Sequence, residues 1–282
     1  MRGSLGNLFG EALSGTQGKK RSLGRYIYVA ILLLITYLPV FIVVAYSFNT
    51  SKYGVWRGFT LDWYKKLLTN RSIAENLLNS LKVASLSSFF AILIGTAGAI
   101  GMSNSRFRGK ELLENIAIAP LMLPEIILGM AYLALFTALK LTFGIATLVL
   151  AHTTFCIPYV YLNVQSRLAG LDPHLVLAAR DLGASSGRAF RDITLPLITP
   201  AIFSGAVLAF AMSMDDVVIS FFVKGVTGDT LPIRIYSLSK VGITPEVYAL
   251  CSLMLAFLII CITLFFLWQM LEKRLRYNGK RA

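Results

Sequence analysis

Long apolar segments alternate with shorter polar segments along most of this chain. The apolar segments cover residues 26–48, 81–102, 116–139, 143–162, 198–223 and 247–271. Each is about 20 residues or longer, which is enough for an α-helix to cross the hydrocarbon core of a bilayer. The first is too long for a secretory signal and lacks a small-residue cleavage site. The pattern therefore predicts an all-α membrane protein with six transmembrane helices.

The longest polar interruption between later apolar segments is the connection 166–196, which contains its own helix signals. Asp172 followed by Pro173 is typical of a helix start, and Gly183 is typical of a helix end, so we expect a short helix at about 173–182. Ser185 or Ser186 can cap a second short helix. Pro196 then stands at the start of the next membrane helix.

The two short helices of this connection have features of a docking surface. Ala178 and Ala179 are small enough for another protein to approach closely, and Phe190 is a candidate apolar anchor on a mostly polar surface. An ordinary loop lying on the membrane surface is the alternative interpretation. The pattern alone leaves both open.

The distribution of basic residues predicts the orientation of the spans. The formal net charge is +13, and 17 of the 27 Lys and Arg residues fall on one side if both termini are cytoplasmic. The positive-inside rule explains this better than nucleic-acid binding does. These residues are Arg2, Lys19, Lys20, Arg21, Arg25, Arg106, Arg108, Lys110, Arg167, Arg180, Arg188, Arg191, Lys273, Arg274, Arg276, Lys280 and Arg281.

The first outer connection, residues 49–80, contains an amphipathic segment. Leu61, Tyr64, Leu67 and Leu68 share one helical face, which predicts a helix lying in the membrane interface. Trp63 and Tyr64 suit the headgroup layer. We expect membrane anchoring as its role rather than contact with an external delivery protein.

Composition agrees with a membrane protein and argues against several chemistries. Hydrophobic residues make up 56% of the chain, and the mean hydropathy is +0.69. The three cysteines lie in apolar segments without metal-ligand spacing, and His152 and His174 have no partner in sequence that would complete a metal or catalytic set. The sequence contains no GxxxxGK[ST] phosphate-binding loop, so any ATP hydrolysis belongs to another chain. A membrane enzyme is disfavoured for the same reasons.

Acidic residues inside apolar segments are the candidates for contact with substrate, because a charge at that depth must face water or a partner. Asp215 and Asp216 lie deep in the fifth segment. Asp216 would share a helical face with Ser213 and Ser220, which favours it over Asp215 for the pathway. Glu125 follows Pro124 at a probable helix break in the third segment. Pairing of each carboxylate with another helix or subunit is the alternative.

Uncompensated acids in an apolar pathway favour a cationic substrate over an anionic one. Tyr159 and other aromatic residues of the fourth and fifth segments are candidates for cation–π contacts, worth about 0.5–2 kcal/mol each. Core packing and lipid contact are the alternative roles for these aromatic side chains.

The connection 166–196 resembles the EAA loop of ABC-transporter permeases, in which Glu-Ala-Ala is followed by glycine and then by Leu-Pro. Ala178, Ala179, Gly183, Leu195 and Pro196 match, whereas Leu177 stands where that family has glutamate. The resemblance implies contact with an ATPase subunit through Arg180, Asp181, Phe190 and the matching residues. It puts in doubt any contact that the missing carboxylate would make.

A narrower resemblance extends over most of the chain. Blocks such as HTTFCIPYVYLNVQSRL (152–168), SMDDVVISFFVKG (213–225) and LPIRIYSLSKVGITPEVYAL (231–250) are similar to the PotC-type permease subunits of bacterial spermidine/putrescine ABC importers. Similar blocks stand at 46–54, 59–68, 106–110 and 178–185. This resemblance implies a type I ABC importer permease fold in a bacterial inner membrane.

The resemblance also implies a set of partners: a PotB-like second permease, two PotA-like ATPase subunits that bind ATP and Mg²⁺, and a PotD-like extracytoplasmic polyamine-binding protein. This chain itself would bind no cofactor. We expect a basic, disordered cytoplasmic tail at 1–24, the permease domain at 25–271 and a basic cytoplasmic tail at 272–282. A related permease for iron, thiamine or another small solute is an alternative. A secondary transporter is a further one, disfavoured because it would not need the loop 166–196.

Overall fold

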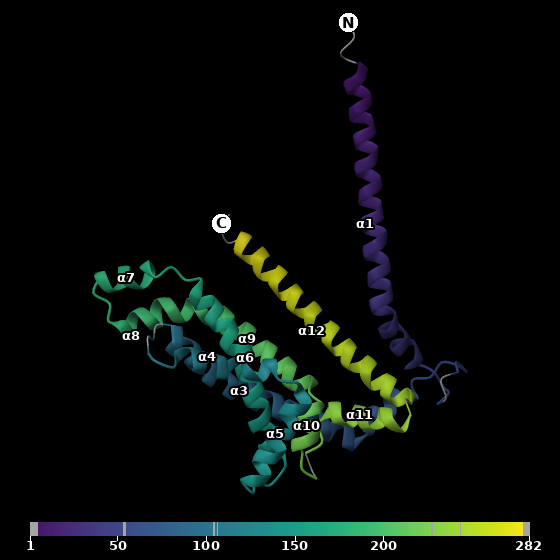
Figure 1. Cartoon of the computed structure of the whole chain (residues 1–282). Helices are drawn as coiled ribbons and strands as arrows, with labels where there is room; N and C mark the ends of the chain where they lie inside the picture. The colour runs from purple at the N-terminus through teal and green to yellow at the C-terminus, as the bar shows by residue number, and fades with distance from the viewer. Residues whose placement is uncertain are drawn as a thin grey trace. The chain divides into compact units, whose positions relative to one another are not determined.

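The computed structural model describes residues 5–52, 55–103, 105, 107–226, 228–242 and 244–278 (Figure 1). Regular secondary structure within them is helical apart from one antiparallel bridge between Asn49 and Phe59. Five of these helices are long and apolar enough to span a membrane, and a sixth candidate consists of two helices joined at a sharp bend. The predicted all-α architecture with six spans is therefore confirmed in its count, provided that the bent pair is taken as one span.

Two compact units divide the chain. The first combines Met1–Thr69 with Gly242–Ala282, and the second is Asn70–Val241. The first unit contains α1 (Leu5–Tyr46), α2 (Asp62–Thr69) and α12 (Pro245–Asn278). Tyr46 of α1 and Tyr248 of α12 meet with their ring centroids 5.9 Å apart. Among the described side chains of α1 and α12, most of the exposed ones are apolar, as expected for helices that face lipid.

Helix α2 corresponds to the predicted interfacial helix, but a different face is buried. Trp63 and Leu67 are its buried residues, whereas Leu61 and Leu68 are exposed. The Trp63 indole Nε1 donates to the carbonyl oxygen of Asn49 at 2.9 Å. The expectation that Trp63 faces lipid headgroups is therefore wrong, because its N–H finds a partner inside the protein.

The two terminal segments are largely helical. Helix α1 starts at Leu5, so the helix extends before the membrane-spanning part, which begins at Gly24. Helix α12 likewise continues to Asn278. No proline interrupts either extension, so the backbone hydrogen bonds can propagate from the membrane-spanning part. Residues 1–4 and 279–282, including Arg2, Lys280 and Arg281, lie outside the described residues, as does Arg106.

The second unit is built on three closely packed helices: α3 (Arg71–Ser103), α6 (Ile145–Ala169) and α9 (Leu195–Asp215). Small residues permit the close approach. Cβ atoms added at Gly95 of α3 and Gly205 of α9 would each come within 3.0 Å of Val160 in α6. Membrane helices pack in this way because van der Waals contact, rather than exclusion of water, drives their association.

Two of the predicted spans are broken. The segment 116–139 consists of α4 (Lys110–Met122) and α5 (Glu125–Ala138), whose axes differ by 111°. The segment 198–223 consists of α9 and the short helix α10 (Val218–Val223), with Asp216 and Val217 between them. The helix break at Pro124 is confirmed. The continuous fifth helix is wrong, since α9 ends at Asp215, and α11 (Leu231–Val241) completes the unit.

Candidate functional site

The break between α9 and α10 is organised by the carboxylate of Asp216. Its backbone is extended, with φ −66° and ψ 127°, and its side chain turns to the start of α10. Oδ1 accepts from the backbone N–H of Ile219 at 3.2 Å, and Oδ2 accepts from that of Ser220 at 2.7 Å. The carboxylate thus satisfies backbone donors at the start of a helix, as an N-capping residue does.

His152 of α6 completes this arrangement from a different helix. Its Nε2 lies 3.3 Å from Asp216 Oδ2 and 2.8 Å from Ser220 Oγ, and its Nδ1 lies 2.7 Å from Ser213 Oγ. The side chains of His152 and Asp216 are 1% and 5% exposed. Four polar side chains from α6, α9, the break and α10 therefore form one buried network.

Asp215, the last residue of α9, is arranged in the opposite way. Its side chain is exposed. Among the residues that the structure describes, it has no ion pair or hydrogen bond. Asp216 was favoured over Asp215 for the pathway because it would share a helical face with Ser213 and Ser220. That argument requires a continuous helix, and α9 ends at Asp215.

The break between α4 and α5 carries a second exposed acid. Leu123 and Pro124 have extended backbones, with ψ of 137° and 133°, and Glu125 is the first residue of α5. Glu125 is exposed and has no hydrogen bond or ion pair within the described part of the chain. It lies near enough to half-buried Tyr159 of α6 for the two groups to interact electrostatically.

The short helices that follow the two breaks pack against each other (Figure 1). Gly129 of α5 is buried against α10. A Cβ added there would lie 2.6 Å from Cδ2 of Phe222 and 3.4 Å from Cα of Ile219. The two breaks, although about 90 residues apart in sequence, therefore form one continuous structural feature of the second unit.

The polar connection folds as its caps predict. Helix α7 (His174–Asp181) follows Asp172, whose Oδ1 accepts from the His174 N–H at 2.9 Å. Gly183 ends it with φ +88°, in the left-handed region that favours glycine. Ser185 caps α8 (Ser186–Ala189) by accepting from the Arg188 N–H. A π-helical turn, η1 (Phe190–Thr194), then leads into α9, where Pro196 lies in the first turn.

Side-chain exposure identifies the apolar surface of this connection. Leu182 is 90% exposed, Leu177 and Ala178 are exposed, and Ala179 is half-buried. Phe190, which we expected to be the apolar anchor, is half-buried instead. Arg180 and Asp181 are exposed. Leu182 therefore stands out as the apolar residue that the sequence analysis missed, although its place just before Gly183 was visible.

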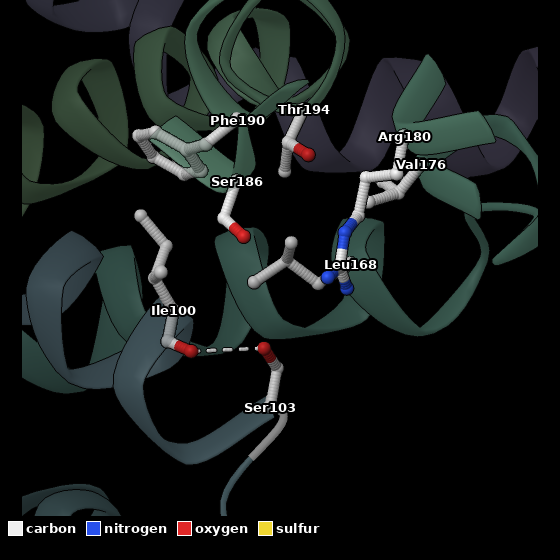
Figure 2. A pocket seen from close by; sticks show the side chains of 8 residues that line it. All are labelled: Ile100, Ser103, Leu168, Val176, Arg180, Ser186, Phe190 and Thr194. Atoms are coloured by element: carbon white, nitrogen blue, oxygen red, sulfur yellow. Dashed lines mark hydrogen bonds between the residues drawn. The ribbon is translucent and has the colours of Figure 1, made fainter. Parts of the chain in front are cut away.

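Phe190 and Arg180 line a cavity of about 270 Å³ beneath α7 (Figure 2). Its other lining residues come from the ends of α3 and α6, from α7 and α8, and from η1: Ile100, Ser103, Leu168, Val176, Ser186 and Thr194. Figure 2 shows Arg180 and Val176 on one side of this space and Phe190 on the other. The short helices therefore rest on the ends of the membrane helices without filling the space between them.

No group of three or more His, Cys, Asp or Glu side chains with metal-binding geometry exists within the described ranges. The candidate functional features are therefore the exposed acids Asp215 and Glu125 and the connection 166–196.

The family model for binding-protein-dependent transport system inner membrane components matches residues 87–277. The chain belongs to this family. The match begins within α3 and covers the rest of the second unit and most of α12. It includes both helix breaks and the connection with α7 and α8. The expected multi-pass inner-membrane protein is confirmed.

Two curated relatives narrow the relationship. The spermidine/putrescine transport system permease protein PotC of Haemophilus influenzae is 42% identical over 220 residues, which are 78% of this chain and 86% of that protein. The putrescine transport system permease protein PotI of Escherichia coli K12 is 40% identical over 227 residues, which are 78% of this chain and 81% of that protein. The resemblance to PotC-type permeases is confirmed.

One chain in the crystal structure of a bacterial ABC transporter involved in the import of the acidic polysaccharide alginate has a similar fold, with a TM-score of 0.71 at 15% identity. The similarity covers 90% of this chain and 96% of that chain. The expected ABC importer permease fold is thereby confirmed. As a permease of this family, the chain is a transport subunit and not the ATP-hydrolysing enzyme.

Proposed function

We propose that this permease forms half of the translocation pathway of an ATP-driven importer for polyamines such as spermidine and putrescine. The observation that carries the proposal is a pair of exposed carboxylates, Asp215 and Glu125, which have no partner among the described residues. They lie at two helix breaks whose following helices, α5 and α10, pack together. The names of the relatives, PotC and PotI, support the same substrate class.

A polyamine carries several ammonium groups separated by short apolar linkers. Fixed carboxylates would replace part of the hydration that each ammonium group loses on leaving water. Tyr159, close to Glu125, would add a cation–π contact or a hydrogen bond. A broken span also frees backbone carbonyl oxygens, such as that of Leu123, to line a water-filled path.

The connection 166–196 would dock on the ATPase. Its exposed apolar residue Leu182, with Ala178 beside it, offers a small surface that a groove in the partner can enclose. ATP-driven closure of the ATPase subunits would move α7 and α8 and change access to the pathway as a rigid-body transition. ATP and Mg²⁺ would be bound by that partner, and this connection and both termini would be cytoplasmic.

The complete transporter would contain a PotB-like second permease, a PotA-like ATPase dimer and a PotD-like binding protein. Lipid would cover the exposed apolar faces of the membrane helices. Membership of the family and the substrates named for PotC and PotI support this set of partners.

Uptake of labelled spermidine and putrescine by cells that express all the transporter subunits tests the substrate class. We expect saturable uptake that requires a functional ATPase and competes with unlabelled polyamine but not with iron or thiamine. Uptake that persists without the ATPase subunit would instead favour a secondary transporter. Competition by iron or thiamine alone would assign another solute to the permease.

Substitution at Gly183 tests the docking role of the connection. Valine is strained at φ +88°, whereas asparagine tolerates this conformation at little cost. We expect Gly183→Val to abolish coupling of ATP hydrolysis to uptake while insertion is preserved, and Gly183→Asn to retain most uptake. Equal uptake by both variants, at equal amounts in the membrane, would contradict the proposed docking.

A further inference from the structure

The buried network around His152 contains a chemical asymmetry. The Asp216 carboxylate accepts from two backbone N–H groups of α10, and a carboxylate can only accept. An unprotonated Nε2 would direct its lone pair at the carboxylate oxygen 3.3 Å away, so the geometry favours the proton on Nε2, which also lies 2.8 Å from Ser220 Oγ. Nδ1 faces only the hydroxyl of Ser213, which can donate or accept. The two ring nitrogens thus have different tasks, with Nε2 serving Asp216.

Asp216 controls the direction of the chain at its own position. Its backbone leaves the helical conformation, Val217 returns to it, and α10 then begins with the donors that the carboxylate holds. The preceding residue, Asp215, is the exposed end of α9. The direction of its side chain is therefore fixed by a turn whose other end is tied to α6 through His152.

Accordingly, we propose that His152 is a positioning residue for transport: its Nε2–H holds Asp216 as the cap of α10, and the resulting turn keeps Asp215 exposed to the substrate. Asp216 itself makes no substrate contact. The assignment of Asp215 to the substrate rests on the proposed function. The placement of Asp215 by His152 does not.

Two conservative substitutions separate the two ring nitrogens. The amide nitrogen of glutamine at position 152 can take the place of Nε2, whereas that of asparagine can reach only the place of Nδ1. His152→Gln therefore keeps an N–H donor to Asp216, whereas His152→Asn removes that donor. Both substituted side chains are polar. A histidine that only fills a polar core would give similar defects in both variants.

The first measurement is the concentration dependence of spermidine uptake by the complete transporter, normalised to the amount of this chain in the membrane. We expect KM to rise about fivefold for His152→Asn and less than about twofold for His152→Gln. In an Asp215→Asn background, the same histidine substitutions should change KM no further, because residues that act through one another are not additive. Equal effects of the two substitutions, or additivity with Asp215→Asn, would overturn the proposal.

A second measurement does not depend on the substrate. Asp215→Cys is made in a chain in which Cys251 and Cys261 are replaced by alanine, while Cys156 stays because it is buried. Its rate of reaction with a membrane-impermeant cationic thiol reagent reports the exposure of position 215. We expect adding His152→Asn to change this rate at least about threefold, and adding His152→Gln to leave it nearly unchanged. Equal rates in both would show that His152 does not position this residue.

The two measurements separate failure of the inference from failure of the proposed function. Without polyamine uptake by the unsubstituted transporter, the proposed function fails, while the labelling rates still decide the role of His152. With normal polyamine uptake and unchanged labelling, the proposed function stands and the inference fails.

Discussion

The two helix breaks of the second unit, between α4 and α5 and between α9 and α10, interrupt a membrane segment in different ways. At α4/α5 the chain uses Pro124, which lacks an N–H and disfavours a helical conformation at Leu123. At α9/α10 there is no proline or glycine, and Asp216 instead caps the new helix while His152 fixes the carboxylate from α6. The backbone chemistry of one residue favours the first break, and a network of side chains favours the second.

The difference changes how an acidic residue near each break should be interpreted. Glu125 is not needed for its break, so its carboxylate is exposed and has no partner within the described ranges. At the other break, the carboxylate of Asp216 is occupied by the backbone N–H groups of α10 and by His152, and the exposed acid is the neighbouring Asp215. An acidic residue in a membrane segment is therefore a candidate for substrate contact only if its carboxylate is not already used to cap a helix.

Removal of the capping carboxylate should give the largest effect. Asp216→Ala leaves two buried N–H groups without their acceptor and removes the carboxylate that faces His152 Nε2, which should cost about 3–5 kcal/mol of folding stability. We expect a large loss of folded chain, measured as the amount in the membrane and as the Tm of the purified transporter. Asp216→Asn, which keeps an acceptor, should lose much less.

Asp215→Ala is the matched control for this experiment. Because Asp215 is exposed and unpartnered in the described part of the chain, its loss should change stability by less than about 0.5 kcal/mol. A Tm for Asp215→Ala that falls as far as that for Asp216→Ala would refute the division between the two acids.

Separating the two short helices should have the next largest effect. Gly129→Leu places a side chain where Phe222 and Ile219 of α10 already lie, which should cost about 1–3 kcal/mol. We expect lower Tm and reduced maximal uptake of every transported polyamine, since both breaks are displaced together. Gly101→Leu is the control, because no atom lies within 4 Å of an added Cβ there. A Gly129→Leu variant with unchanged Tm would show that α5 and α10 do not depend on this contact.

Neutralising the exposed acids should affect substrate more than stability. Asp215→Asn and Glu125→Gln should each raise the KM for spermidine about tenfold and that for the less charged putrescine by less, because each removes one attraction to an ammonium group. Uptake kinetics with Tm measured in parallel would show this. Equal changes in KM for the two polyamines would indicate that these carboxylates do not sense substrate charge.

The sequence was sufficient where local backbone chemistry decides the structure. The polar connection followed from Asp172, Gly183 and Ser185, because caps and left-handed glycines act over a few residues. The break at Pro124 followed for the same reason.

The break at Asp216 depends on contacts across about 60 residues of sequence and was therefore missed. The polar residues Ser213, Asp216 and Ser220 were correctly grouped, but as one helical face. Their common partner, His152, was visible only as a lone histidine in an apolar segment. The sequence signals for this break were weak: a histidine in an apolar segment, and an aspartate with no proline or glycine beside it.

The smallest effect is expected at the break that proline makes. Alanine can adopt the backbone conformation of Pro124, with φ −57° and ψ 133°, and Pro124 donates no hydrogen bond that would be lost. The packing of α5 on α10 should then keep the break open. We therefore expect Pro124→Ala to change the folding stability by no more than about 1 kcal/mol, with a correspondingly small shift in Tm, and to leave the KM for spermidine nearly unchanged. A KM that rises as in Glu125→Gln would mean that α4 and α5 have joined into one helix and carried Glu125 with them. In that case the backbone alone would define this break, whereas an unchanged KM would show that its packing against the side-chain-controlled break is sufficient.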